Sequence, residues 1–316
     1  MKKLNFGCGE EIKISFLMAA HNEEKIIAKT LKNLISLPYK NYEVILGLDG
    51  CTDKTEEIVK SFEKKSKKIK HYNLNIREGK PAVINKIIKK ANGEIIIIND
   101  ADWIFRVKDG DSLEQLLNIF NNPKVGCIAD SFSVQYPARG GAGILEIGVM
   151  MQNQIWIDYI KEHGKKIDNV WIIADKNFSP LIVNIFRKKL YKPNQTLGDD
   201  FERFYDIVNS GLEIAVTTDS RLPRMITAGE TYKFKELIKI KERTALARNQ
   251  LKNIKKPVKI LSLRFLWYIL RRMSYMSFKE FIGFSLLNLA FLIGSTKSKF
   301  QKNISTKEGW KMRLTR

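Results

Sequence analysis

Cysteine is scarce in this sequence of 316 residues, which contains only Cys8, Cys51 and Cys127. The three cysteines are odd in number, widely spaced, and without the close pairing typical of structural metal sites. This pattern excludes a scaffold held by disulfides and predicts that the protein works in a reducing compartment.

Long apolar runs are also missing. The amino terminus, Met1-Lys2-Lys3, continues into polar residues and predicts no signal peptide. No window reaches the roughly 18 unbroken apolar residues that a spanning helix needs. The longest candidate, residues 281–293, contains Ser285 and Asn288. We expect this segment to lie in a membrane surface or to re-enter it.

Acidic residues are almost absent from the last 96 residues, where 23 Lys and Arg stand against five Glu and no Asp. This segment therefore holds +18 of the total formal charge of +21, and the rest of the chain is nearly neutral. The contrast predicts one unit over residues 1–220 and a basic helical appendage over 221–316. Such a block of positive charge indicates a polyanionic partner, either an anionic membrane surface or a nucleic acid.

Predicted strands and helices alternate along the first 220 residues. Strands are expected over residues 12–20, 42–48, 69–73, 95–98 and 125–129, with amphipathic helices between them. This alternation predicts an α/β fold, with a mostly parallel, doubly wound central sheet flanked by helices.

The run Ile95 to Ile98 has no polar face at any period, so it predicts a strand buried on both sides. Asp100 and Asp102 follow it. If the chain stays extended, both carboxylates leave the same side at the carboxyl end of the strand, where open α/β sheets bind ligands. The pair suits Mg²⁺ or Mn²⁺. For an isolated Asp-Ala-Asp a solvated turn is the preferred interpretation, and the motifs upstream favour the metal site.

Polar loops also follow the two earlier strands of the predicted sheet. Asn22 is expected to cap the helix that follows the first strand. After the second strand, Gly50 provides a tight turn, and Thr52 or Asp53 is expected to cap the helix over residues 55–65.

Together these motifs resemble family 2 glycosyltransferases, which have the Rossmann-like GT-A nucleotide-sugar fold. The resemblance covers about 90 residues and rests on the order of Ala20-His21-Asn22-Glu23, Asp49-Gly50-Cys51-Thr52-Asp53, Gly79-Lys80-Pro81-Ala82, and Gly93-Glu94 followed by Asp100-Ala101-Asp102. Each motif alone is weak, whereas their shared order and spacing are specific.

The resemblance implies a role for each matched residue in binding the donor. Asp49 matches the residue that hydrogen-bonds the nucleotide base, beside Ala19, Ala20 and Asn22. Lys80 matches a basic residue near the diphosphate. Asp100 would face the ribose or the metal-bound phosphates, and Asp102 would ligate the metal. Leu48 stands where many relatives carry an acidic residue. This difference leaves the recognition of the nucleotide base less defined.

A second acidic pair, Asp199-Asp200, opens a helix after Gly198. From the residues alone it could be ordinary helix capping. The resemblance implies that Asp200 is the catalytic base, with Asp199 as the fallback. A carboxylate that takes the proton of an acceptor hydroxyl, opposite a departing nucleoside diphosphate, implies one displacement that inverts the anomeric carbon.

The basic segment begins with residues 221–242, expected to form a loop and linker. Residues 241–248 fall where polysaccharide-making relatives carry a Gln-x-x-Arg-Trp motif, but Ala245 and Leu246 occupy the Arg-Trp places. This degeneracy favours transfer of one sugar or a few. Arg243 and Arg248 are expected to be solvated, with phosphate contact as the alternative.

Apolar residues flanked by cations over 258–273 predict a helix in a membrane interface. The alternative is packing on the core or on a second subunit. The sequence thus predicts a peripheral or monotopic enzyme on the cytoplasmic face of a membrane. Its expected donor is a nucleotide sugar, with a UDP-sugar favoured, and its expected acceptor is lipid-linked or a glycan. A polyprenyl-phosphate glycosyltransferase is the alternative, and a basic nucleic-acid-binding protein is disfavoured because no nucleic-acid module is present.

Overall fold

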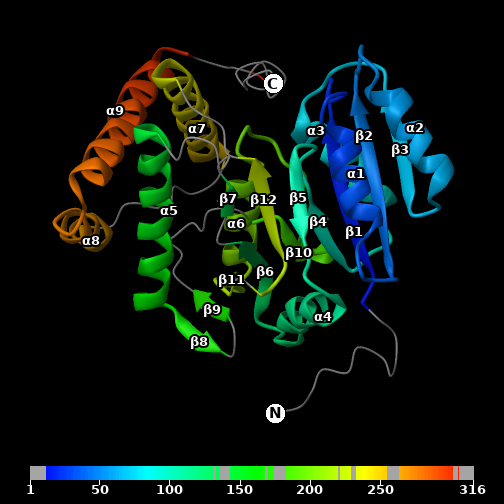
Figure 1. The fold of residues 1–316 in the computed structure, drawn as a ribbon, viewed down its shortest axis with the longest axis horizontal. Helices are drawn as coiled ribbons and strands as arrows, with labels where there is room; N and C mark the ends of the chain where they lie inside the picture. The colour runs from blue at the N-terminus through cyan, green and yellow to red at the C-terminus, as the bar shows by residue number, and fades with distance from the viewer. Residues whose placement is uncertain are drawn as a thin grey trace.

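The computed structural model describes residues 12–130, 133–135, 143–167, 170–173, 183–219, 221–228, 233–254, 263–301 and 305. Strands and helices alternate along most of the chain, and the last helices gather on one side of the molecule (Figure 1). The strands are β1 (Ile14–Ala20), β2 (Tyr42–Asp49), β3 (Ile69–Leu74), β4 (Ile95–Ile98), β5 (Trp103–Arg106), β6 (Val125–Asp130), β7 (Ser133–Gln135), β8 (Lys165–Ile167), β9 (Val170–Ile173), β10 (Ile185–Arg187), β11 (Glu213–Thr217) and β12 (Arg224–Ala228). The helices are α1 (Ile27–Ile35), α2 (Thr55–Lys65), α3 (Lys80–Ile87), α4 (Gly110–Asn118), α5 (Ile144–His163), α6 (Asp199–Asn209), α7 (Phe234–Ile254), α8 (Leu263–Met273) and α9 (Phe278–Phe300).

The main sheet has nine strands in the order β3-β2-β1-β4-β10-β6-β11-β9-β8. The neighbours β3, β2, β1 and β4 pair in parallel, and so do β6 and β11. Within the described chain, only β9 and β10 run against the other strands of this sheet. The predicted α/β fold with a mostly parallel sheet is therefore confirmed.

The isoleucine strand β4 lies at the centre of this sheet, between β1 and β10. Ile95 and Ile97 belong to one hydrophobic cluster, and Ile96 and Ile98 belong to another. Successive side chains point to opposite faces of a strand, so both faces of β4 are covered by apolar residues. The predicted strand buried on both sides is confirmed.

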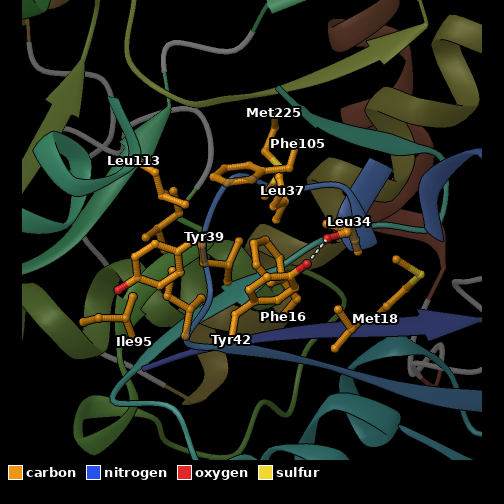
Figure 2. Packing of buried hydrophobic residues seen from close by; sticks show 14 of the residues in the cluster. Phe16, Met18, Leu34, Leu37, Tyr39, Tyr42, Ile95, Phe105, Leu113 and Met225 are labelled. Carbon is orange, nitrogen blue, oxygen red and sulfur yellow. Dashed lines mark hydrogen bonds between the residues drawn. The ribbon is translucent and has the colours of Figure 1, made fainter. Parts of the chain in front are cut away.

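Aromatic packing fills the core on one face of the sheet (Figure 2). The Phe16 ring meets Tyr42 and Phe105 edge to face, with centroid distances of 5.9 and 5.4 Å. The Tyr42 hydroxyl donates to the carbonyl oxygen of Leu34 at 2.7 Å. These contacts fix α1 and β5 against β1 and β2, and burial raises the pKa of Tyr42 to about 12.

A second, three-stranded sheet has the order β5-β12-β7. Its middle strand β12 lies within residues 221–242, which we expected to be a loop and linker, and α7 begins inside the same range. That expectation was wrong because β12 pairs with β5, more than a hundred residues earlier in the chain. Local sequence patterns do not reveal such a distant partner.

The last helices pack on one another and on α5, away from α1, α2 and α3 (Figure 1). The α5–α9 contact is very close, because a Cβ on Gly148 would lie 2.1 Å from the carbonyl oxygen of Gly283. Helix α9 is longer than the predicted apolar segment 281–293, since Ser277 and Glu280 form a capping box at its start. Among the described helices, α9 alone has the length and composition to cross a membrane. Residues 255–262, including the start of the helix predicted over 258–273, lie outside the described residues.

Candidate active site

The loops that follow β1 and β2 are joined to each other. Asn22 accepts a hydrogen bond from the Thr52 amide at 2.8 Å and donates one to its hydroxyl at 3.1 Å. Asn22 has a φ of 54°, and the residue before α1 is Ile26. The expectation that Asn22 caps this helix was wrong, because Asn tolerates positive φ and its side chain is used across the sheet edge. Ala19 and Ala20 end β1 beside this loop.

Asp49 ends β2 and is only 2% exposed. Its two carboxylate oxygens accept the backbone amides of Glu78 and Gly79 at 2.6 and 2.9 Å. Gly79 has a φ of 93°, which favours glycine there. On the backbone side, His21 Nδ1 donates to the Asp49 carbonyl oxygen at 2.6 Å. Asp49 therefore holds the loop in front of α3, and its contact with a nucleotide base stays a prediction.

The acidic pair after β4 lies in a turn. The Trp103 backbone amide donates to the Asp100 carbonyl oxygen at 3.0 Å. The side chain of the fully buried Asn99 donates through Nδ2 to the carbonyl oxygens of Asp100 and Trp103. The expectation of an extended chain beyond Ile98 was wrong, because Asn99 stabilises the turn. Asp102 is buried, whereas the Asp100 carboxylate is partly exposed.

Lys80 connects this turn to the start of α6. Its side chain is buried, and its Nζ lies 2.6 Å from Asp100 Oδ1 and 3.8 Å from Asp199 Oδ2. Burial alone would lower the pKa of Lys80, but the two carboxylates raise it. Two acidic motifs about 100 residues apart thus meet at one ammonium group, which therefore stays charged.

Asp199 is also held by Arg203, whose Nη1 donates to Asp199 Oδ2 at 2.8 Å. The remaining guanidinium donors bind Asn184 Oδ1 and the Val183 carbonyl oxygen, each at 2.8 Å. Burial opposes ionisation of Asp199, but Lys80 and Arg203 hold its pKa below the usual range. Asp199 is therefore a fixed anion, which does not suit the fallback role of base.

Asp200, the next residue, has different surroundings. It is half-buried, and Oδ1 accepts the Phe201 amide at 2.9 Å. Burial raises its pKa, and the Asp199 charge raises it further. A carboxylate with a raised pKa is a stronger base than an ordinary aspartate, so this environment suits proton abstraction.

Helix α7 covers the start of α6. The Leu197 amide donates to Gln250 Oε1 at 3.0 Å, and a Cβ on Gly198 would lie 3.1 Å from the Cβ of Ala247. The Nε atoms of Arg243 and Arg248 are buried, so the expectation that these arginines are solvated was wrong. The Arg248 guanidinium lies over the Phe201 and Phe291 rings, 5.5 and 5.4 Å from their centroids.

Few side chains of this site could ligate a metal ion. Within the described ranges, no group of three or more His, Cys, Asp or Glu side chains could hold a metal ion. Asp102 and Asp100 could supply one or two carboxylates, with phosphate oxygens and water completing the shell, as Mg²⁺ and Mn²⁺ allow. Asp100 also pairs with Lys80, and the assignment of the metal ligand to Asp102 stays a prediction.

Two residues of the site were missed by sequence reasoning. Arg203 follows Asp199 by one helical turn, and this i, i+4 spacing of opposite charges was a usable signal. For Asn184, the resemblance of residues 184–188 to an acceptor-side segment of the family did not reveal the contact with Arg203, which depends on the tertiary placement of α6 against the segment before β10.

A comparison with protein-family models matches residues 15–172 to glycosyl transferase family 2. Among curated proteins, the chain is 36% identical over 116 residues to the poly-beta-1,6-N-acetyl-D-glucosamine synthase of Staphylococcus epidermidis, covering 36% of this chain and 27% of the relative. It is 37% identical over 119 residues to a beta-monoglucosyldiacylglycerol synthase of a Nostoc species, covering 36% and 25%. The matches thus span about a quarter of the length of these curated relatives.

Solved structures show a similar fold. The mannosyltransferase PcManGT from Pyrobaculum calidifontis, in complex with GDP-Man and Mn²⁺, has a TM-score of 0.66 at 14% identity, covering 93% of this chain and 89% of that chain. Staphylococcus aureus TarS 1-349, in complex with UDP-GlcNAc, has a TM-score of 0.52 at 15% identity, covering 95% and 92%. At these identities the likeness supports the GT-A fold alone.

Replacing Asp49 with asparagine tests its hold on the loop before α3. Asparagine has one acceptor oxygen, so one of the amides of Glu78 and Gly79 would lose its partner. An unsatisfied buried donor costs about 1–3 kcal/mol, so we expect Asp49→Asn to lower the free energy of unfolding by that amount in a urea titration. The exposed Glu114→Gln is the matched control. Equal stability of the two variants would contradict the assignment.

Proposed function

Because the chain belongs to glycosyl transferase family 2, we propose that it moves one sugar or a few from a nucleoside-diphosphate donor to a hydroxyl of a lipid-linked or glycan acceptor, with inversion. UDP-sugars are the first donors to test. The names of the similar proteins include both a glycan synthase and a glycolipid synthase, so both acceptor classes are open.

The observation that carries this proposal is the position of Lys80 between Asp100 and Asp199. It supports one site in which the proposed donor-side carboxylates and the proposed base Asp200 lie around a single cation. A donor between the end of β4 and the start of α6 would have the leaving diphosphate on one side and the base on the other, the arrangement that inversion requires.

In the proposed mechanism, Asp200 takes the proton of the acceptor hydroxyl as the bond to the sugar forms. Asp49 holds the loop before α3, which would line the nucleotide-sugar site. Ala19, Ala20 and Asn22 would line the same site from the end of β1 and the loop after it. Asp102, assisted by Asp100, would hold Mg²⁺ or Mn²⁺, which when bound supplies positive charge that stabilises the departing diphosphate. Lys80 keeps Asp100 in place and adds positive charge to the same region.

Asp200→Asn tests the base. We expect turnover with a hydroxyl acceptor to fall by about 10²–10⁴, the usual contribution of a general base, while the variant still binds nucleoside diphosphate. In the wild type, kcat should fall as the pH drops through the raised pKa of Asp200, because protonation removes the base. The measurement is release of nucleoside diphosphate from a panel of nucleotide sugars. Undiminished turnover would favour transfer to an acceptor that is already ionised, such as polyprenyl phosphate.

For location, we propose that α8 and the exposed side of α9 bind the cytoplasmic face of an anionic membrane, peripherally or monotopically. Helix α8 buries Phe265 and Tyr268 against Trp156 and Tyr159 of α5. Its other side exposes apolar residues, with Trp267 at 70% exposure, and the apolar exposure continues into α9. The exposed members are Leu266, Trp267, Leu270, Tyr275, Phe278, Phe281, Leu289 and Leu292.

Vesicle binding tests this location. Burying Leu266 and Trp267 in lipid is worth about 1.5–3 kcal/mol per side chain, so the variant Leu266→Glu/Trp267→Glu should bind anionic phosphatidylglycerol vesicles at least about tenfold more weakly. Ile76→Glu, at an exposed apolar residue in the loop between β3 and α3, is the control and should bind as the wild type does. Equal retention of both variants, or preference of the wild type for duplex DNA over these vesicles, would contradict the membrane proposal.

A further inference from the structure

Four charged side chains form an alternating chain through the proposed active site. Asp100 pairs with Lys80, Lys80 approaches Asp199, and Asp199 pairs with Arg203. Lys80, Asp199 and Arg203 are all less than a tenth exposed. The two positive and two negative charges balance, so this network of four side chains is neutral as a whole.

Hydrogen bonds that include the backbone close this network of side chains into a ring. Arg203 donates to the Asn184 side chain, and the Asn184 carbonyl oxygen accepts the Ile98 amide at 2.9 Å. Ile98 ends β4, two residues before Asp100. The ring therefore ties α3, α6, β4 and the segment before β10 together at the place where the two acidic motifs meet.

Buried ion pairs are a poor source of stability, because the loss of hydration of each charge offsets most of the attraction. What such a network does supply is a fixed geometry. Asp199 is the residue next to Asp200, and its carboxylate is the point at which the ring holds the first turn of α6. Only two side chains, those of Lys80 and Asp199, connect the Asp100 carboxylate to the backbone next to Asp200.

We propose that Lys80 and Asp199 are positioning residues, which couple engagement of Asp100 by the donor to the placement of Asp200. This inference rests on the proposed function. When the donor competes for Asp100, Asp199 is the other carboxylate of the ring within reach of the Lys80 ammonium. A shift of Lys80 toward Asp199 would then readjust the start of α6 only in the donor-bound enzyme.

The charges around Asp200 indicate the direction of the pH effect. Asp199 raises the pKa of Asp200, whereas Arg203 and Lys80 lower it, and Arg248 approaches from α7. Removing the Asp199 charge leaves an excess of positive charge beside Asp200. The acid limb of the kcat profile should therefore move to lower pH in Asp199→Asn, a result that a purely structural role would not produce.

A double-mutant cycle tests the coupling. The variants are Lys80→Met, Asp199→Asn and the double variant, which removes one charge of each sign and restores neutrality. We expect each single change to lower kcat more than it weakens binding of nucleoside diphosphate. The double variant should be at least about tenfold more active than the product of the single effects, because the two residues act as a unit. Thermal unfolding should show the same partial recovery in the double variant.

The control cycle is Lys60→Met with Glu56→Gln, an exposed lysine–glutamate pair on α2. Its effects on kcat should be negligible and additive. If Lys80→Met unfolds the protein, Lys80→Arg keeps the charge and should leave the acid limb at its wild-type pH. Additive effects of Lys80→Met and Asp199→Asn, with an unmoved acid limb, would overturn the inference. A wild-type enzyme that uses no nucleotide sugar would instead overturn the proposed function.

Discussion

The burial of β4 between β1 and β10 determines where the acidic residues of this protein lie. Its isoleucines contribute to both hydrophobic clusters, so the strand can neither slide nor turn over without exposing apolar side chains. Its carboxyl end is consequently fixed at one edge of the sheet, and Asn99 then turns the chain so that Asp100 meets Lys80. The rest of the site is assembled around that fixed point.

Two loops and one helix complete the assembly, and each is held by side-chain hydrogen bonds. Asp49 orders the loop that presents Lys80, Asn22 joins the first two loops, and Arg203 fixes Asp199 at the start of α6. The neighbours Asp199 and Asp200 have opposite pKa shifts, because cations surround the first while burial dominates the second. One carboxylate is thereby kept as a structural anion, and the other has the raised pKa that suits the proposed base.

Much of this organisation could be predicted from the sequence, because strong local patterns specify it. The bounds of α2 and β4 match the predicted ranges, since periodicity and the uninterrupted isoleucines leave few alternatives. The turn at Asp100, the conformation of Asn22 and the strand β12 were predicted wrongly. The turn at Asp100 depends on the side chain of Asn99, which donates to the carbonyl oxygen of Trp103 four residues on. The other two features depend on distant partners, Thr52 for Asn22 and β5 for β12. The ring through Asn184 is of the same kind, whereas the helical pair of Asp199 and Arg203 could have been found from its spacing.

The central claim is that the turn after β4 holds a divalent cation together with a nucleoside diphosphate. The most direct test is titration of Mn²⁺ by electron paramagnetic resonance, with UDP or GDP present, in the wild type and in Asp102→Asn. We predict one tightly bound Mn²⁺ per wild-type chain, only in the presence of the nucleotide, and at least about tenfold weaker binding in the variant, as loss of a ligand requires. Equal affinity in the two proteins would contradict the account.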